Sequence, residues 1–328
     1  MSSSLQNICY FDEEAIKAEN DHLEIILVPG WGSNLISIMH KETQREVLRS
    51  PRSSEEFWAN PVLFGVPILF PPNRISDGTF TFRGRVYRFN INEKDKNNHI
   101  HGFLNTKKWQ LVRTEATENE LIIETKIESD LLSYPSIYQQ FPHHFSIQMS
   151  YRLKKTVICK DATIINHGKD PFPWGLGYHT TFLFPEENSS FAVTAEKRWK
   201  LDERFLPTGE LEDLENKAAL NQGISLKEVK LDDAFLSTFS KEGKSKVSIV
   251  YKNNDFVKNL RIDYLADNNF KNWVVYNADG KQGFVCPEPY TWITNAPNLN
   301  IPASLTGLQV LFPGEQVTVK TEIQFTTL

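Results

Sequence analysis

Phe145-Ser-Ile-Gln-Met-Ser-Tyr-Arg-Leu153 and Thr156-Val-Ile-Cys-Lys-Asp-Ala-Thr-Ile-Ile-Asn166 are the two stretches that decide the fold class. Apolar residues recur at about every second position in both, which is the period of a strand that buries one face. We therefore predict a half-buried β-strand in each stretch.

The same alternation continues on both sides of these stretches. It covers residues 22–28, 34–39, 79–89, 109–113, 120–128, 246–251, 260–264, 272–276, 307–312 and 316–325. The segment 79–89 has two alternating arms about Gly84, which predicts a hairpin. Helical signals are short: residues 53–58 begin like a capped turn, and residues 130–134 offer another. Many strands with almost no helix are typical of an all-β fold, here a large antiparallel β-sandwich with few short helices.

The length and composition are compatible with one large β domain. The chain has 328 residues, of which 40% are hydrophobic, and large sandwiches reach this size as a single unit. No low-complexity linker interrupts it, and the charged stretch 202–230 is the best candidate for an insertion. We predict a single domain over residues 1–328.

Charge and targeting signals exclude several classes of partner. Lys and Arg total 36 against 41 Asp and Glu, a net charge of −5 without a basic block, so no nucleic-acid partner is expected. The first residues lack the pattern of a signal peptide, and the longest apolar runs are too short to cross a bilayer, so no membrane partner is expected. The three cysteines are far apart and suggest neither disulfides nor a Cys-x-x-Cys site. We expect a soluble protein of the cytoplasm; the sequence does not indicate an oligomeric state.

His179 lies in the segment Pro171-Phe-Pro-Trp-Gly-Leu-Gly-Tyr-His-Thr-Thr-Phe-Leu-Phe184. Two prolines and two glycines break the strand pattern there and place the imidazole among aromatic side chains. A histidine held by such a backbone is suited to transferring a proton near neutral pH.

Glu288 follows an apolar strand in Gly283-Phe-Val-Cys-Pro-Glu-Pro-Tyr-Thr-Trp292 and lies between Pro287 and Pro289. A carboxylate fixed in a mostly aromatic environment has a raised proton affinity, as a general base requires. A purely structural role would leave its charge without an evident partner in the local sequence, so the functional interpretation is favoured.

Arginine and aspartate side chains offer groups that bind sugar hydroxyls. Phe64-Gly-Val-Pro-Ile-Leu-Phe-Pro-Pro-Asn-Arg-Ile75 ends an apolar strand at two prolines and then presents Arg74, whose fixed set of donors suits a hydroxyl or an anion. Leu231-Asp-Asp-Ala-Phe235 presents Asp232 and Asp233, either of which could accept hydrogen bonds. Taken alone, an arginine that caps a strand end and solvated turn acids are the commoner roles.

His99 and His101 form a His-x-His pair, which invites a metal interpretation because residues two apart on a strand share a face. A third ligand should then lie close in sequence, but the residues that follow are Asn105 and Thr106. A metal site is therefore disfavoured, and the glycine after His101 instead suggests a tight turn that brings this imidazole close to a ligand.

Taken together, these segments resemble the aldose 1-epimerase (galactose mutarotase-like) family, from about Gly30 to Phe325 and in the same order. The segment with Arg74 resembles the family's arginine motif, His101-Gly-Phe resembles its first histidine motif, and Gly177-Tyr-His179 resembles the segment of the general acid. Leu231-Asp-Asp-Ala-Phe235 resembles the segment with a sugar-binding aspartate, best placed at Asp232, and Glu288-Pro resembles the general base.

This resemblance implies a galactose mutarotase-like sandwich that interconverts the α and β anomers of a free hexose without a metal or organic cofactor. Glu288 would be the base, His179 the acid, and Arg74, His101 and Asp232 would bind the monosaccharide. Two departures stand out: Thr180 replaces the proline of the best-known members, and Leu104-Asn105 replaces the Ala-Arg of the hexose-6-phosphate branch. The alternatives are a hexose-6-phosphate 1-epimerase, a non-catalytic sugar-binding sandwich, and a metal-dependent enzyme that uses His99 and His101.

Overall fold

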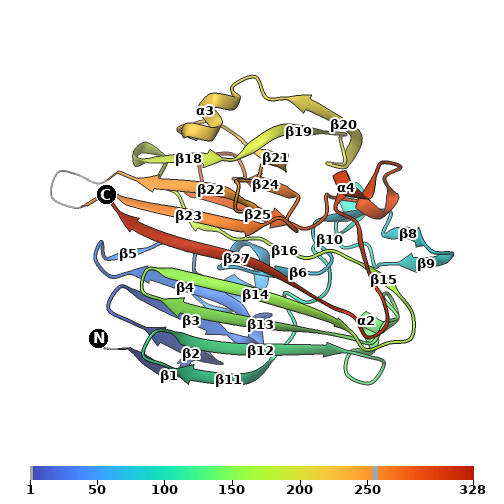
Figure 1. Cartoon of the computed structure of the whole chain (residues 1–328), viewed down its shortest axis with the longest axis horizontal. Helices are drawn as coiled ribbons and strands as arrows, with labels where there is room; N and C mark the ends of the chain where they lie inside the picture. Colours follow the sequence, from blue (N-terminus) through green and yellow to red (C-terminus); the bar gives the residue numbers. More distant parts are fainter. Residues whose placement is uncertain (1–2, 253–257) are drawn as a thin grey trace.

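The strands β13 (Phe145–Lys154) and β14 (Val157–Asn166) form a hairpin in the middle of an eight-stranded antiparallel sheet (Figure 1). The computed structural model describes residues 3–252 and 258–328. The strands of this first sheet follow the order β11 (Gln110–Ala116), β12 (Leu121–Ser129), β13, β14, β27 (Gln316–Thr327), β23 (Leu260–Asp267), β22 (Lys244–Tyr251) and β18 (Ser189–Val193).

A second eight-stranded sheet carries most of the residues that matter for function. Its order is β20 (Pro207–Asp213), β19 (Ala195–Leu201), β21 (Asp232–Ser237), β24 (Asn272–Tyr276), β25 (Phe284–Tyr290), β16 (Gly177–Tyr178) and β6 (Ile68–Leu69), and β17 (Phe182–Leu183) also pairs with β25. The charged stretch 202–230, expected as an insertion, supplies the edge strand β20 of this sheet.

The N-terminal part forms a five-stranded sheet of β1 (Ser4–Tyr10), β2 (Glu13–Glu19), β3 (Leu23–Val28), β4 (Asn34–His40) and β5 (Arg45–Glu46). Two-stranded ribbons join β7 (Arg74–Ser76) to β10 (Asn98–Ile100), β8 (Thr79–Phe82) to β9 (Arg85–Arg88), and β15 (Phe172–Trp174) to β26 (Gln309–Leu311). The β8–β9 ribbon confirms the hairpin predicted about Gly84.

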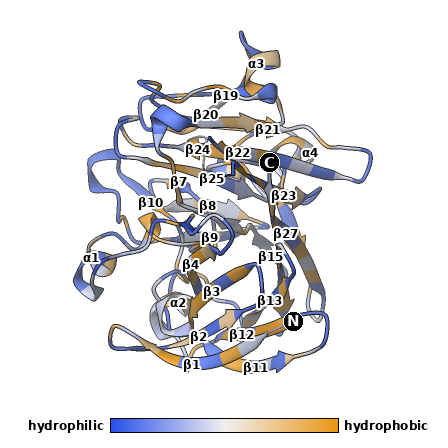
Figure 2. Ribbon diagram, turned by 90° about the vertical axis from the view of Figure 1, so that its left-hand side faces the viewer, coloured by the Kyte–Doolittle hydropathy of each residue, from blue (hydrophilic) through white to orange (hydrophobic). Residues whose placement is uncertain are grey.

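The two large sheets pack face to face around an apolar core. Side chains that alternate in hydropathy give several strands hydrophobic and hydrophilic bands, which are clearest on β27 (Figure 2). One cluster of buried apolar residues includes side chains from Ile16 to Phe325, and a single domain over residues 1–328 stays a prediction. Lys160 of β14 lies over the ring of Tyr178 of β16, so the inner faces of the two sheets are in contact.

The helices are few and short, as predicted. They are α1 (Ser54–Ala59), α2 (Pro135–Tyr138), α3 (Lys217–Gln222) and α4 (Ala303–Thr306), with 3-10 turns at Pro29–Trp31, Pro61–Leu63, Lys94–Lys96, Glu186–Asn188 and Ala296–Asn298. The Ser53 side chain caps α1, and the capped turn expected over residues 130–134 is present: Asp130 accepts hydrogen bonds from the amides of Leu132 and Ser133. The helix α2 begins after this turn. No helix within the described ranges has the length and apolar character needed to cross a bilayer. The cytoplasmic location stays a prediction.

Candidate active site

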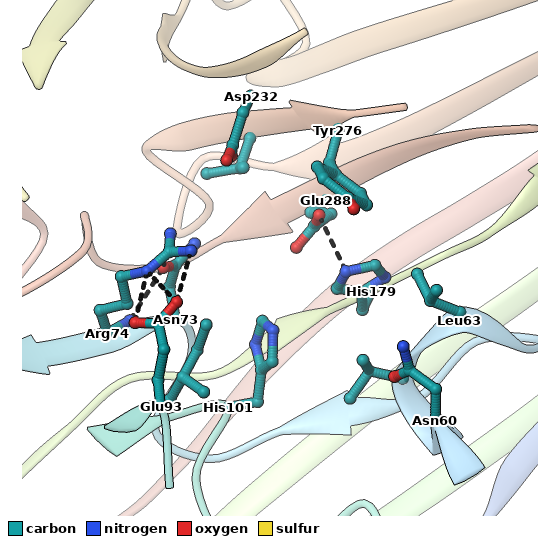
Figure 3. Close-up of a pocket in the computed structure, with 13 residues that line it drawn as sticks. Asn60, Leu63, Asn73, Arg74, Glu93, His101, His179, Asp232, Tyr276 and Glu288 are labelled. Carbon is teal, nitrogen blue, oxygen red and sulfur yellow. Dashed lines mark hydrogen bonds and ion pairs between the residues drawn. The ribbon is translucent and has the colours of Figure 1, made fainter. Parts of the chain in front are cut away.

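All five side chains selected from the sequence line one cavity of about 300 Å³ (Figure 3). Its described lining consists of Asn60, Val62, Leu63, Asn73, Arg74, Glu93, Ile100, His101, His179, Asp232, Val274, Tyr276 and Glu288. Small-molecule sites in proteins typically measure about 300–1,000 Å³, so this cavity matches a small ligand such as a monosaccharide.

His179 and Glu288 form the centre of the site. Nε2 of His179 lies 3.3 Å from Oε1 of Glu288, and the two side chains are only 5% and 2% exposed. Burial lowers the pKa of His179 to about 4 and raises the pKa of Glu288 well above its ordinary value, because both charged forms lose their contact with water. A buried imidazole and carboxyl this close can exchange one proton, so the geometry provides an acid and a base together.

The strand β25 explains why Glu288 is accessible to His179. Pro287 and Pro289 both pair with β24, so their missing amide hydrogens are expected on the opposite side of β25. On that side β25 pairs with β17 up to Val285 and with β16 only at Tyr290. Between Val285 and Tyr290 this side of β25 is unpaired, and the segment that carries His179 lies beside it. The amide of His179 donates instead to the carbonyl of Pro67 at 3.1 Å.

Tyr290 is the partner of Glu288 that sequence reasoning missed. Its hydroxyl donates a hydrogen bond to Oε2 of Glu288, and this bond opposes the burial that raises the pKa of Glu288. Residues two apart on a strand share a face, so this partner could have been found from the period of β25. Gly177 makes room for it: a Cβ atom there would lie 2.3 Å from the ring of Tyr290.

His101 enters the cavity because the strand pattern stops one residue before it. β10 ends at Ile100, and His101 adopts a left-handed φ of 64°, so His99 and His101 do not share a face. Nδ1 of His99 donates to the carbonyl of Asn90 and the ring packs against Phe103, whereas the ring of His101 lies 5.3 Å from that of His179. Burial lowers the pKa of His101 well below its ordinary value, with His179 as the next cause, so this imidazole is neutral.

Arg74 stands at the start of β7 and makes a two-pronged ion pair with Glu93. Its Nε lies 3.1 and 3.0 Å from the two carboxylate oxygens of Glu93, and its Nη2 lies 2.9 Å from Oε1. Asn73 accepts a longer bond from Nη1 at 3.4 Å. Glu93 was not selected from the sequence because it stands in a loop without a strand or helix pattern, where no local signal marks it.

Asp232 and Tyr276 lie opposite each other on β21 and β24, at the edge of the cavity. Burial raises the pKa of Asp232, and its carboxylate makes no hydrogen bond to another described residue. Asp233 is not in the lining and pairs with Arg198 at 3.1 Å. The structure therefore places Asp232, and not Asp233, where it can accept hydrogen bonds from a ligand.

Thr180 faces the opposite way from the adjacent His179, into the core. Its Oγ1 donates to the hydroxyl of Tyr264 at 3.2 Å, and the fully buried Lys160 donates to the same hydroxyl at 3.0 Å. The polar side chain of Thr180 is thus hydrogen-bonded inside the sandwich.

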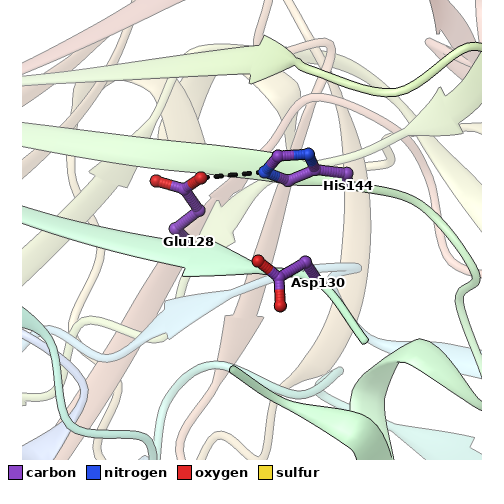
Figure 4. Close-up of side chains that lie close together, drawn as sticks. All are labelled: Glu128, Asp130 and His144. Carbon is purple, nitrogen blue, oxygen red and sulfur yellow. Dashed lines mark hydrogen bonds and ion pairs between the residues drawn. The ribbon is translucent and has the colours of Figure 1, made fainter. Parts of the chain in front are cut away.

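A group of potential metal ligands, Glu128, Asp130 and His144, lies outside the lining of the cavity (Figure 4). Its polar atoms already have partners: Glu128 pairs with Lys126 at 2.7 Å and with His144 at 2.8 Å, and Asp130 closes the turn described above. Neither His99 nor His101 belongs to a three-ligand group among the described residues. The metal-dependent alternative therefore finds no geometric support at this pair.

Two solved structures share this fold over nearly the whole chain. A galactose mutarotase-like protein from Clostridium acetobutylicum has 27% sequence identity and a TM-score of 0.91, over 100% of this chain and 99% of that one. The galactose 1-epimerase of Lactobacillus acidophilus NCFM has a TM-score of 0.78 over 99% of both chains, and its 15% identity shows a common fold alone.

A curated relative matches over a shorter stretch. Uncharacterized protein YihR of Escherichia coli (strain K12) is 29% identical over 146 residues, which cover 43% of this chain and 44% of that protein. The chain thus matches less than half of that relative's length. The profile of the family described as aldose 1-epimerase, in contrast, matches residues 14–324, nearly the whole sequence. The chain therefore belongs to the aldose 1-epimerase family.

Proposed function

We propose that this protein is an isomerase that interconverts the α and β anomers of a free, neutral hexose. The observation that carries the proposal is the buried contact of 3.3 Å between His179 and Glu288 in a cavity of monosaccharide size. Membership of the aldose 1-epimerase family supports it.

In the proposed reaction Glu288 accepts the proton of the anomeric hydroxyl while His179 donates a proton to the ring oxygen. The bond between the anomeric carbon and the ring oxygen then breaks, which leaves an open-chain aldehyde. Rotation about the adjacent carbon–carbon bond exposes the other face of the aldehyde, and the ring closes with the two roles reversed. Each such proton transfer typically contributes about 10²–10⁴-fold to the rate.

The pair needs one proton for this cycle. Because burial raises the pKa of Glu288 and lowers that of His179, that proton rests on Glu288 in the free protein. Transfer across the 3.3 Å gap gives the imidazolium and carboxylate that the reaction uses, and it leaves the net charge of the pair unchanged. The cavity therefore never has to hold an additional buried charge.

Three further side chains form the proposed binding frame. Asp232 would accept hydrogen bonds from sugar hydroxyls, since its carboxylate has no other described partner. Neutral His101, beside His179, would hydrogen-bond a sugar oxygen, and Arg74 would donate to hydroxyls from its edge that is not occupied by Glu93. The half-buried ring of Tyr276 offers an apolar face to the sugar ring.

Polarimetry with freshly dissolved α-glucose and α-galactose tests the proposal. The wild-type protein is expected to accelerate mutarotation above the buffer rate, Glu288→Gln to abolish the acceleration while sugar binding remains, and His179→Asn to lower it by several orders of magnitude. His144→Asn and Glu128→Gln are matched controls, because they break a His–Glu contact of 2.8 Å outside the cavity.

Two outcomes would contradict the proposal. Sugar binding without any acceleration by the wild-type protein would favour the non-catalytic sugar-binding alternative. Near wild-type rates in Glu288→Gln or His179→Asn would refute the assigned roles.

A further inference from the structure

The cavity contains a single permanent cation among its described lining residues. Arg74 is the only Lys or Arg there, whereas Glu93, Asp232 and Glu288 supply three carboxyl groups. Even with Glu288 protonated, the remaining acids outnumber the arginine. The cavity therefore has no net positive charge with which to attract an anion.

One edge of the arginine is also occupied by a carboxylate. Both carboxylate oxygens of Glu93 accept bonds from the Arg74 guanidinium at 2.9–3.1 Å, and the two side chains are only 12% and 14% exposed. A two-pronged arginine–carboxylate pair fills the donor edge that would otherwise bind a phosphate or carboxylate ligand. At this edge an anionic ligand would have to displace Glu93 and leave its charge buried, which is costly; at the other edge, which is open to neutral hydroxyls, the charge of Glu93 already offsets that of the guanidinium.

A second layer of contacts holds Glu93 in this position. Nδ2 of Asn98 donates to Oε2 of Glu93 at 2.8 Å, and Oδ1 of Asn98 accepts from Nη2 of Arg204 at 2.9 Å. The ring of Phe205 covers the guanidinium of Arg74, with 5.0 Å from Cζ to the ring centroid. The carboxylate is thus fixed against Arg74 by groups that do not themselves line the cavity.

We propose that Glu93 is a specificity-determining residue, which neutralises Arg74 and thereby restricts the site to uncharged aldoses. Sugar phosphates and uronic acids are rejected because their anionic group finds no free cation and meets the carboxylates of Glu93 and Asp232. This inference rests on the proposed function, whose substrate class it defines.

The test compares glucose, glucose 6-phosphate and glucuronate with the wild-type protein and Glu93→Gln. Glutamine keeps the size and one acceptor oxygen for Arg74 but removes the charge. We expect the wild type to favour glucose, and Glu93→Gln to raise kcat/KM for both anionic sugars relative to glucose by at least about tenfold, a gain that weakens as salt is added. Glu93→Asp retains the charge and is expected to keep the wild-type preference.

Glu56→Gln is the matched control, because Glu56 makes a similar two-pronged pair with Arg52 on the surface, outside the cavity. Its preference among the three sugars is expected to equal that of the wild type. Melting temperatures of all variants check that they are folded.

Direct binding of glucose and glucose 6-phosphate, measured by calorimetry, separates this inference from the proposed function. A wild-type protein that turns over no sugar refutes the function, yet the ratio of the two affinities still tests Glu93. The inference is overturned if folded Glu93→Gln keeps the wild-type ratio, if the wild-type protein binds both sugars equally well, or if neither protein binds either sugar.

Discussion

Removal of the Tyr290 hydroxyl tests how the Glu288 carboxylate is stabilised. In Tyr290→Phe, Oε2 of Glu288 loses the hydrogen bond that opposes its burial, so the pKa of Glu288 rises further. A hydrogen bond to a charged group contributes about 1.5–3 kcal/mol. The carboxylate form that accepts the anomeric proton becomes correspondingly rarer, and we expect kcat/KM at neutral pH to fall by about 10–100-fold.

The pH dependence distinguishes this explanation from a general disturbance of the core. With a higher pKa for Glu288, the pair keeps its one proton up to a higher pH. The decline of kcat/KM at high pH should therefore move to higher pH in Tyr290→Phe. Tyr87→Phe is the matched control: the Tyr87 hydroxyl is hydrogen-bonded to His143 at 2.9 Å, buried and outside the cavity lining. This variant should lose stability without loss of rate. If polarimetry gives Tyr290→Phe a rate within threefold of wild type and an unshifted profile, the reasoning is refuted.

Three further predictions concern the pair and its surroundings. Because a second proton inactivates the His179–Glu288 pair and burial lowers the pKa of His179 to about 4, kcat/KM should fall on acidification only near that pH; a midpoint near 6.5 would contradict this. Lys160→Met should raise the free energy of unfolding at pH 7 by on the order of 1 kcal/mol in denaturant titrations, because burial lowers the pKa of Lys160 and unfolding then takes up a proton. That gain should shrink as pH rises toward the ordinary lysine pKa, and a pH-independent difference would exclude the mechanism. Gly177→Ala should lower the mutarotation rate, since its Cβ would collide with the Tyr290 ring, whereas Gly84→Ala, whose Cβ meets no atom within 4 Å, should not affect that rate.

Strand alternation was sufficient to predict the fold class. Each stretch expected to form a strand contains one, from β3 to β27. Several strands were missed, among them β18 to β21 of the two large sheets and the N-terminal strands β1 and β2. Ser4–Tyr10 and Glu13–Glu19 carry polar residues on both faces, and no residue of β1 is buried. A strand that forms by pairing with a neighbour, rather than by burying one face, leaves little local signal.

Some residues of the candidate site could likewise be predicted from the sequence, and others could not. Histidine, glutamate and arginine next to proline and glycine could be selected from the sequence, because a broken strand pattern marks them. Glu93 could not, since its role depends on Arg74, which is 19 positions away in the chain and becomes its neighbour only through tertiary contacts. The pairing of His179 with Glu288 likewise joins residues that no sequence spacing relates.

The second sheet creates this site by an interruption in its own pairing. A fully paired β25 would have a regular neighbouring strand beside Glu288, in the place where the irregular segment with His179 now lies. The prolines at 287 and 289 remove the two amides that such a neighbour would bind, while the chain between β16 and β17 leaves the ladder at His179. Thr180, next along the chain, remains tied to the core through Tyr264 and Lys160. The same backbone irregularity therefore opens a space beside the carboxylate and fixes the imidazole that faces it, which explains why a rigid sandwich can hold an acid and a base in contact.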